Sequence, residues 1–417
     1  MKEKLKVFVI SDHPFSPSGV GIQTRYMMEG LLKTGKYSFV VFGGAIKHQD
    51  YKPQKIEEWG EDLVIYPVDG YGTQDSVRSI IRTEKPDLLW FMTDPRFFPW
   101  LWEVEDEIRT LMPMVYYHVW DNYPYPEFNK TWYDSNDVVV SISKVTKDIV
   151  DNVSPDIKSY YLPHAVDPRI FKPLNIEERA ELRRQTNLGE EKFIIFWNNR
   201  NARRKQPGTL IFWFKEFLDR VGHDKAQLLM HTDPKDSNGP NLVAILEKLN
   251  LTNGEVRFST QKLDFPHMAA LYNSADVTVN ISDAEGFGLS TLESLSCGTP
   301  IVVNMTGGLQ EQVTDGEEWF GAGIEPNSKA IIGSQDIPYI YEDRVGMDDF
   351  LNGLMKIYEL SKEQRAEIGL QGYNHVNKNY NFEKYVEEWD NILSETHENF
   401  GSWETRKGYE KWKLVEV

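Results

Sequence analysis

Two carboxylates, Glu285 and Glu293, stand with seven residues between them in the segment DAEGFGLSTLESLSCGTP. Glu285 is followed at once by Gly286, Phe287 and Gly288, in which two glycines that favour a turn flank a phenylalanine. Glycine lets a backbone approach a ligand closely, and the N–H groups of a helix that begins at Leu289 would face an oxyanion or a hydroxyl. Eight helical positions rise only about 12 Å. Two acids at that spacing could hold both ends of one extended ligand, or Glu293 could simply be solvated on an amphipathic helix.

A second group of candidate residues is basic and lies in FWNNRNARRKQP, at the end of an apolar run. Arg200 and Lys205 are five positions apart in it. A guanidinium together with an ammonium can bind a phosphate group and neutralise its charge. We therefore expect Arg200 and Lys205 to bind phosphate, and we expect Arg203 and Arg204 to be solvated in a basic turn.

Two further groups follow apolar runs in the first half of the chain. In SDHPFSPSGVGIQTRYMMEGLL, the backbone N–H groups of Gly19 and Val20 precede an amphipathic helix and could bind a phosphate or an acceptor. The segment lacks Gly-x-Gly-x-x-Gly, which disfavours a nicotinamide enzyme. In VYYHVWDNYPYPEFN, His118 closes an apolar run and Asp121 follows three residues later. The histidine could have a functional role, although a lone histidine at a strand end is more often a structural hydrogen-bonding group.

The elements that must position these residues are short apolar runs that alternate with helical segments, which predicts an α/β fold with parallel strands. The first series of expected strands is 6–10, 37–42, 63–68, 87–92, 114–119, 138–142 and 160–162. The second series is 192–197, 227–231, 256–258, 277–281 and 301–303, and a helical pattern follows from about 354 to 393. Two series predict two doubly wound domains. Ligands of such sheets bind beyond the carboxyl ends of the strands, where all four groups of candidate residues lie.

Composition agrees with two domains and narrows the class of protein. The chain has 417 residues, and single hydrophobic cores stop growing at about 250–300 residues. Its formal charge of -18 gives no long-range attraction to nucleic acid or anionic lipid. The single cysteine, Cys297, allows no intrachain disulfide and fits a reducing compartment. No run approaches the ~20 apolar residues of a membrane span, so we expect a soluble, cytoplasmic protein. No group of side chains has metal-ligand spacing, so we expect neither a metal nor another cofactor.

The segment around the two acids resembles the retaining GT-B glycosyltransferases of family 4, whose hallmark is a Glu, seven residues and a Glu. FPHMAALYNSADVTVNISDAEGFG and LESLSCGTPIVVNMTGGLQEQV are similar to the flanking sequences of that family. Arg200 and Lys205 match its Gly-Arg-x-x-x-x-Lys motif, with Asn199 in place of the glycine. The Ser-Gly pair that ends at Gly19 stands where the family has Gly-Gly, and His-Val-Trp-Asp replaces its His-Asp dipeptide. YNFEKYVEEWDNIL resembles its closing helix.

The resemblance implies a GT-B fold with two Rossmann-like domains that face a central cleft, and a C-terminal helix that crosses back to the first domain. We expect an acceptor-side domain at 1–175, a nucleotide-sugar-binding domain at 176–375, and the crossing helix and tail at 376–417. The implied activity is metal-independent transfer of a hexosyl or pentosyl group from a nucleoside diphosphate sugar, with retention by front-face displacement. In the implied site Glu285 and either His118 or Asp121 are catalytic. Donor-binding residues would be Arg200, Lys205, Glu293, Gly286, Phe287, Gly288, Leu289, Gly19 and Val20.

Other functions remain open from the sequence. A sugar phosphorylase or a nucleotide-sugar epimerase could use the same fold and the same phosphate-binding residues, and a non-catalytic sugar-nucleotide-binding protein could keep them too. Within the transferase interpretation, the acceptor could be a glycan, a lipid, a metabolite, a protein or a modified nucleobase. Neither the donor base nor its sugar follows from the residues, because base pockets consist mostly of backbone and apolar contacts.

Overall fold

A computed structural model describes residues 4–186, 188–189 and 191–411 of the chain. Contacts divide the chain into two compact units. Unit 1 comprises Met1–Ala165 and Phe382–Val417, and unit 2 comprises Val166–Asn381. The domain limits expected from the sequence, at 175 and 375, stay a prediction.

Unit 1 is built on an eight-stranded sheet of order β3-β4-β2-β1-β5-β6-β7-β8. All neighbouring strands pair in parallel except β3 with β4. The strands are β1 Leu5–Asp12, β2 Tyr37–Gly44, β3 Gln54–Lys55, β4 Leu63–Pro67, β5 Leu88–Met92, β6 Met114–His118, β7 Val138–Ser141 and β8 Lys158–Tyr161. The α-helices are α1 Gly19–Lys33, α2 Gln74–Glu84, α3 Pro99–Trp102, α4 Glu105–Arg109, α5 Lys130–Asp134, α6 Lys144–Val153 and α15 Phe382–Phe400. The central strands are buried along most of their length, as expected when helices cover both faces of a parallel sheet.

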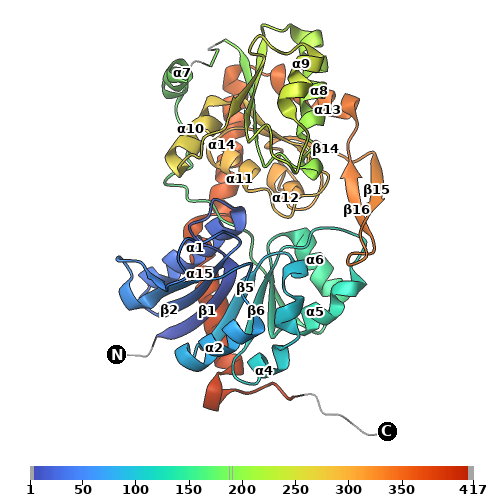
Figure 1. The fold of residues 1–417 in the computed structure, drawn as a ribbon. Helices are drawn as coiled ribbons and strands as arrows, with labels where there is room; N and C mark the ends of the chain where they lie inside the picture. Colours follow the sequence, from blue (N-terminus) through green and yellow to red (C-terminus); the bar gives the residue numbers. More distant parts are fainter. Residues whose placement is uncertain (1–3, 187, 190, 412–417) are drawn as a thin grey trace. The chain divides into compact units, whose positions relative to one another are not determined.

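Unit 2 contains a parallel six-stranded sheet of order β11-β10-β9-β12-β13-β14 and a separate antiparallel hairpin, β15-β16 (Figure 1). The strands are β9 Phe193–Asn198, β10 Ala226–His231, β11 Val256–Ser259, β12 Val277–Asn280, β13 Ile301–Asn304, β14 Gly321–Ile324, β15 Ser328–Ile332 and β16 Ile340–Arg344. The α-helices are α7 Ile176–Gln185, α8 Pro207–Val221, α9 Leu242–Leu249, α10 Phe265–Ser274, α11 Leu289–Ser296, α12 Leu309–Val313, α13 Met347–Tyr358 and α14 Lys362–Asn379. A 3-10 turn, η4, spans Arg203–Lys205.

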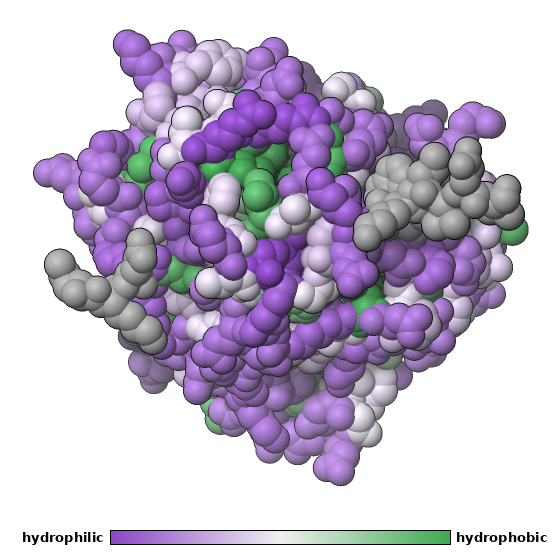
Figure 2. All heavy atoms as spheres, turned by 90° about the horizontal axis from the view of Figure 1, so that it is seen from below, coloured by the Kyte–Doolittle hydropathy of each residue, from purple (hydrophilic) through white to green (hydrophobic). Residues whose placement is uncertain are grey.

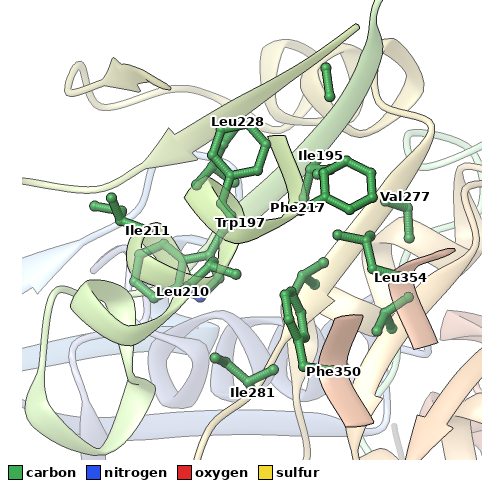
Figure 3. Close-up of a cluster of buried hydrophobic side chains, with 14 of the residues drawn as sticks. Ile195, Trp197, Leu210, Ile211, Phe217, Leu228, Val277, Ile281, Phe350 and Leu354 are labelled. Atoms are coloured by element: carbon green, nitrogen blue, oxygen red, sulfur yellow. The ribbon is translucent and has the colours of Figure 1, made fainter. Parts of the chain in front are cut away.

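Large apolar side chains from α8 and α13 pack on one face of the six-stranded sheet (Figure 3). Phe217 of α8 and Phe350 of α13 are fully buried there. They contact the same core cluster as Ile195 of β9 and Val277 of β12. Because β9 and β12 are the two central strands, this core fixes the strand ends that carry the candidate residues of unit 2.

Helix α15 belongs to unit 1, where it packs on α1 (Figure 1). The rings of Tyr26 and Phe382 lie 5.3 Å apart edge to face, and those of Trp90 and Trp389 lie 5.6 Å apart. The expected contact of a C-terminal helix with the first domain is therefore confirmed. The tail continues along the same unit, since Arg406 forms a buried ion pair with Asp137 at 2.7 Å.

All twelve strands expected from the sequence are present, with ends that differ by at most two residues. Four strands were not expected, namely β3, β14, β15 and β16. Strand β14 contains Gly321 and Gly323, and glycine weakens the sequence signal for a strand. Strand β3 is only two residues long. Strand β15 is largely exposed, and β16 is mostly half-buried and contains three charged residues, so neither hairpin strand shows a continuous apolar run.

The surface seen from below is mostly hydrophilic, with hydrophobic atoms confined to a few patches (Figure 2). This agrees with 64 acidic and 46 basic residues in the chain. Among the residues that the structure describes, no helix is both long enough and apolar enough to cross a membrane.

Close packing of α1 on α15 leads to a prediction about stability. A Cβ at Gly30 would lie 2.1 Å from Val386 Cγ2. Alanine ordinarily favours a helix over glycine by up to about 1 kcal/mol, but here Gly30→Ala should lower the free energy of unfolding by about 1–3 kcal/mol through overpacking. Urea unfolding of the wild type and of Gly30→Ala measures this difference in the free energy of unfolding. The double variant Gly30→Ala/Val386→Ala should regain much of the loss, and equal stability of Gly30→Ala and wild type would contradict the packing argument.

Candidate functional site

The topology of unit 2 creates a switch point between β9 and β12. From β9 the chain adds β10 and β11 on one side of the sheet, and it then crosses to add β12, β13 and β14 on the other. The connection that follows β9 therefore runs over one face of the sheet, and the connection that follows β12 runs over the other. Their divergence opens a crevice for a ligand at the carboxyl ends of these two strands. These two strands end at Asn198 and Asn280.

The structure brings Lys205 and Glu285 together beside this switch point. Lys205 Nζ donates a hydrogen bond to Glu285 Oε2, and the two side chains are only 10% and 12% exposed. Asn280 Nδ2 at 3.2 Å and Ser282 Oγ at 3.4 Å donate to the same carboxylate oxygen. Burial alone would raise the pKa of Glu285, but the charges of Lys205 and Arg204 and the hydrogen bonds from Lys205 and Asn280 hold it below its ordinary value. Glu285 is therefore an ionised carboxylate.

Backbone contacts fix the loop that carries Glu285. Gly307 has a φ of +50°, and a Cβ there would lie 1.8 Å from the carbonyl oxygen of Glu285, so only glycine fits. The next residue, Gly308, donates its N–H to that carbonyl at 3.1 Å. Gln312 Nε2 donates to the carbonyl of Phe287 at 2.7 Å. The glycine pair in MTGGLQEQV thus holds the carboxylate loop against the start of α12.

The remaining residues of this loop differ in exposure. Gly286 and Leu289 are half-buried, and Leu289 begins α11. Gly288 has a φ of +93°, which favours glycine in the turn before that helix. Phe287 is buried, and its ring lies 5.9 Å from the ring of Tyr380. The side chain of Phe287 therefore supports the loop from inside unit 2, and donor binding by residues 286–289 stays a prediction.

Glu293 lies on α11 and is half-buried, so the solvated alternative for this residue is wrong. Tyr272 of α10 donates its hydroxyl to Glu293 Oε2 at 2.7 Å, and Asn198 Nδ2 donates to the same hydroxyl at 2.8 Å. This chain of hydrogen bonds connects α11 to the end of β9. Burial raises the pKa of Glu293 to about 7, and the Tyr272 hydroxyl partly offsets that rise. Glu293 therefore changes charge near neutral pH.

The structure does not bring Arg200 to Lys205. The guanidinium of Arg200 is 66% exposed and pairs with Asp236 at 2.7 Å. That hydrogen-bonded pair raises the pKa of Arg200 and lowers the pKa of Asp236. Joint phosphate binding by Arg200 and Lys205 stays a prediction, and it needs Arg200 to leave Asp236.

Arg203 and Arg204 are exposed residues, but the expectation of two merely solvated arginines is wrong. Arg203 makes two hydrogen bonds to Glu342 of β16, at 3.0 and 2.5 Å. Arg204 Nη1 donates to the carbonyl of Ala284 at 2.5 Å. Both side chains therefore connect η4 to other segments of unit 2.

In unit 1, a carboxylate is bonded to the N-cap residue of α1. Ser18 caps this helix by accepting from the N–H of Gly21 at 3.0 Å, and its hydroxyl donates to Asp12 Oδ2 at 2.5 Å. Tyr71 donates to the other oxygen of Asp12 at 2.8 Å. Gly19 and Val20 are half-buried beside it. The negative charge of Asp12 opposes a phosphate at this helix end, so phosphate binding by Gly19 and Val20 stays a prediction with an electrostatic cost.

The structure buries His118 completely in unit 1. Its Nε2 lies 2.8 Å from the hydroxyl of Tyr133, and burial lowers the pKa of its imidazole to about 3. A neutral imidazole in the core is suited to holding Tyr133 in place. Asp121 is half-buried and contributes, after the larger effect of Asp94, to raising the pKa of Arg96. Catalytic roles for His118 and Asp121 stay predictions.

Several residues of this site were missed in the sequence. Asn198, Asn280 and Ser282 lie at the ends of β9 and β12, where the strand-end rule could have identified them. Tyr272 and Glu342 carry no comparable signal, because only the folded chain brings them to the site. Across the described part of the chain, no group of three or more His, Cys, Asp or Glu side chains is placed to hold a metal ion.

Comparison with known proteins extends these observations. Residues 178–344 match the model of the family described as glycosyl transferases group 1. An uncharacterized glycosyltransferase of Methanocaldococcus jannaschii is 27% identical over 266 residues, which are 62% of this chain and 58% of that protein. The chain thus matches less than two thirds of the length of this relative.

Two solved structures share the fold of the whole chain. A sucrose-phosphate synthase from Thermosynechococcus elongatus superposes with a TM-score of 0.75 and 18% identity, over 95% of this chain and 100% of its own. Anabaena HepE in complex with UDP and glucose superposes with a TM-score of 0.68 and 15% identity, over 94% of this chain and 100% of its own. With its two Rossmann-like sheets and α15 packed on α1, the chain has the GT-B fold.

The hydrogen bond from Tyr272 to Glu293 yields a prediction about pH. Glu293 has a folded-state pKa of about 7 against an ordinary 4.5, so its contribution lowers stability as the pH rises from about 4.5 to about 7. Tyr272→Phe removes a hydrogen bond that favours the ionised form of Glu293, so the pKa of Glu293 should rise further. The decline in stability should therefore extend to higher pH. The variant should also lose about 1–3 kcal/mol, since it leaves the Asn198 amide without its partner.

Urea unfolding from pH 5 to 9 measures both effects. Tyr272→Phe/Glu293→Gln is the matched control, because it lacks the titrating group. If the pH dependence of the two variants were the same, Glu293 would not be the group responsible.

Proposed function

We propose that this chain transfers a sugar from a nucleoside diphosphate sugar to an acceptor hydroxyl, because its residues 178–344 match the model of the glycosyl transferases group 1 family. The single observation that carries the proposal is the buried Lys205–Glu285 pair at the switch point of unit 2. It combines a cation for a diphosphate with an ionised carboxylate for a sugar. Because HepE, which shares the fold, was solved with UDP and glucose, we propose a UDP-hexose as the donor.

In the proposed complex, Lys205 binds the diphosphate. Its ammonium has Glu285 as a partner in the structure, and a diphosphate offers it a stronger one with more than one charge. When the ammonium of Lys205 binds the phosphate instead of Glu285, the carboxylate of Glu285 can accept hydrogen bonds from sugar hydroxyls. Asn199 Nδ2 is buried beside Arg200 without a hydrogen-bond partner in the described residues, so this strand end retains an unused donor.

Glu293 binds the ribose hydroxyls in this proposal. A carboxylate accepts both hydroxyls of a ribose better than a neutral carboxyl does. Since the pKa of Glu293 is about 7, the favoured form becomes dominant only above neutral pH. Tyr272 and Asn198 orient the carboxylate from the protein side.

The proposed reaction proceeds on one face of the sugar. The bond between the anomeric carbon and the diphosphate oxygen breaks, and the acceptor oxygen bonds to the same carbon from the side of the departing group. The acceptor proton passes to an oxygen of the leaving diphosphate, so no further base is needed. Glu285 stabilises the positive charge that develops on the sugar, and Lys205 stabilises the negative charge on the diphosphate. The configuration of the anomeric carbon is thus retained.

A panel of nucleotide sugars tests the function. UDP-, ADP- and GDP-hexoses are compared by thermal shift and by released diphosphate, with sugar, polyol, lipid and nucleic-acid acceptors. We expect the largest shift and diphosphate release with a UDP-hexose and retention in the product by NMR. Glu285→Gln should lower turnover about 100- to 1000-fold, the usual cost of removing one electrostatic stabiliser, with UDP affinity changed less than about threefold.

Three outcomes would overturn the proposal in different ways. Sugar release that requires inorganic phosphate would identify a phosphorylase. Conversion of the nucleotide sugar to its epimer without diphosphate release would identify an epimerase. Tight nucleotide binding without turnover on any acceptor would identify a binding protein, and unchanged turnover in Glu285→Gln would refute the role of that carboxylate.

The phosphate-binding role of Lys205 gives a separate prediction. Lys205→Met should weaken UDP binding about 10- to 100-fold, from the loss of a charged hydrogen bond worth about 1.5–3 kcal/mol. Lys215→Met is the matched control, because Lys215 pairs with Asp219 on the exposed side of α8. Isothermal titration measures both.

Loss of stability must be separated from loss of binding. Lys205→Met leaves Glu285 buried without its cation, which is costly, whereas Lys205→Met/Glu285→Gln removes both charges. The double variant should be more stable than Lys205→Met and still bind UDP weakly. UDP affinity at the wild-type level in either variant would rule out this role for Lys205.

A further inference from the structure

The hairpin β15-β16 is a part of unit 2 to which the proposed function assigns no role. It stands apart from the six-stranded sheet (Figure 1). Isolated two-stranded hairpins are at best marginally stable in water. Most residues of β15 are exposed, whereas Glu342 of β16 is buried. The contacts that hold the hairpin must therefore lie at its returning strand, β16.

Four charged side chains form a network that joins β16 to two segments of the candidate site, namely the turn η4 and the loop after β12. Glu342, 3% exposed, accepts from Arg203 of η4 and from Arg344 at 2.5 Å. Arg344 also pairs with Asp283 at 2.8 Å, and Asp283 is 4% exposed. Two carboxylates and two guanidinium groups balance one another here. Buried carboxylates are tolerated only when they are paired in this way.

Hydrogen bonds from a backbone N–H, a hydroxyl and an amide fix the same arrangement. Asp343 donates its backbone N–H to the carbonyl of Asp283 at 2.8 Å. Thr306 Oγ1 donates to Asp343 Oδ2 at 2.7 Å, and Gln206 Nε2 donates to Asp283 Oδ2 at 2.6 Å. Strand β16 is thus hydrogen-bonded to the loop after β12 and to the segment after β13.

The two ends of this network lie next to the Lys205–Glu285 pair. Arg203 and Lys205 belong to the same three-residue turn, so an anchor on Arg203 restricts where the ammonium can lie. Asp283 precedes Glu285 by two residues in a loop that is buried at both positions 283 and 284. Displacement of β16 would release both segments at once.

We propose that the β15-β16 hairpin is a positioning element of the donor site, with Glu342 as its positioning residue. Glu342 contacts no substrate and acts through Arg203, whose turn holds Lys205 where the diphosphate binds. The proposal rests on the proposed function, because it requires Lys205 to bind a nucleoside diphosphate. A purely structural role for Glu342 would predict that its replacement lowers stability alone. The positioning role predicts that the replacement also lowers the affinity for the donor, by more than the loss of stability can explain.

The test uses the full chain and UDP as the probe, measured by isothermal titration and urea unfolding. Glu342→Gln keeps the shape of the side chain and removes its charge, and it should weaken UDP binding about tenfold. Asp276→Asn is the control, because Asp276 also forms an ion pair in unit 2, with Arg183 near the amino end of β9, and its side chain is 10% exposed. It should lower stability without changing UDP affinity by more than about twofold.

A second variant covers the case in which Glu342→Gln does not fold. Arg203 is 60% exposed, so Arg203→Met is tolerated more easily. It should weaken UDP binding by a similar factor, and Arg203→Met/Glu342→Gln should bind UDP no more weakly than the weaker single variant. The effects of the two substitutions should not add, because Arg203 and Glu342 act through the same ion pair.

The outcomes separate this proposal from the proposed function. Wild-type UDP affinity in Arg203→Met, or equal losses in Glu342→Gln and Asp276→Asn, would overturn the positioning role while the function stands. If the wild-type chain bound none of UDP, ADP and GDP, the proposed function itself would fail, and the positioning role with it.

Discussion

The buried ion pair between Lys205 and Glu285 is the interaction on which the organisation of unit 2 depends. The two residues are 80 positions apart in the sequence, and they meet only because β9 and β12 are neighbours in the sheet. Withdrawal of two charges from water is expensive and is offset only by good geometry and further hydrogen bonds. Asn280 and Ser282 supply such bonds to the carboxylate. The glycine pair at 307 and 308 holds the loop where those bonds can form.

The two acids of the Glu-x7-Glu segment show how environment assigns different chemistry to identical groups. Both are withdrawn from water, but Glu285 has a cation beside it and Glu293 has a neutral hydroxyl. The pKa of Glu285 consequently lies below its ordinary value, whereas the pKa of Glu293 rises to about 7. Divergent pKa values of this kind separate functional roles in active sites. A permanently ionised carboxylate suits stabilisation of positive charge, and a carboxyl that titrates near neutrality suits reversible binding.

The sequence predicts the parts of the structure that depend on local signals. Continuous apolar runs identify the buried strands of both sheets, and the spacing of motifs at strand ends identifies Lys205 and Glu285. Partners supplied by distant segments leave no such trace. Nothing near Arg200 indicates that Asp236 will bind it, and nothing near Arg203 indicates Glu342. The burial of His118 does not follow from its position either, because a histidine at a strand end can lie in the core or project beyond the end of the strand.

The switch points of the two sheets differ in the charged groups that they present. In unit 1 the end of β1 presents Asp12, bonded to the hydroxyls of Ser18 and Tyr71 and to no cation in the described residues. In unit 2 the corresponding region presents the ammonium of Lys205 paired with the carboxylate of Glu285. The cation in unit 2 supports the proposal that this unit binds the anionic part of the donor. Because the carboxylate of Asp12 is bonded to the N-cap residue of α1 and would repel a phosphate there, unit 2 is the better candidate for holding a diphosphate.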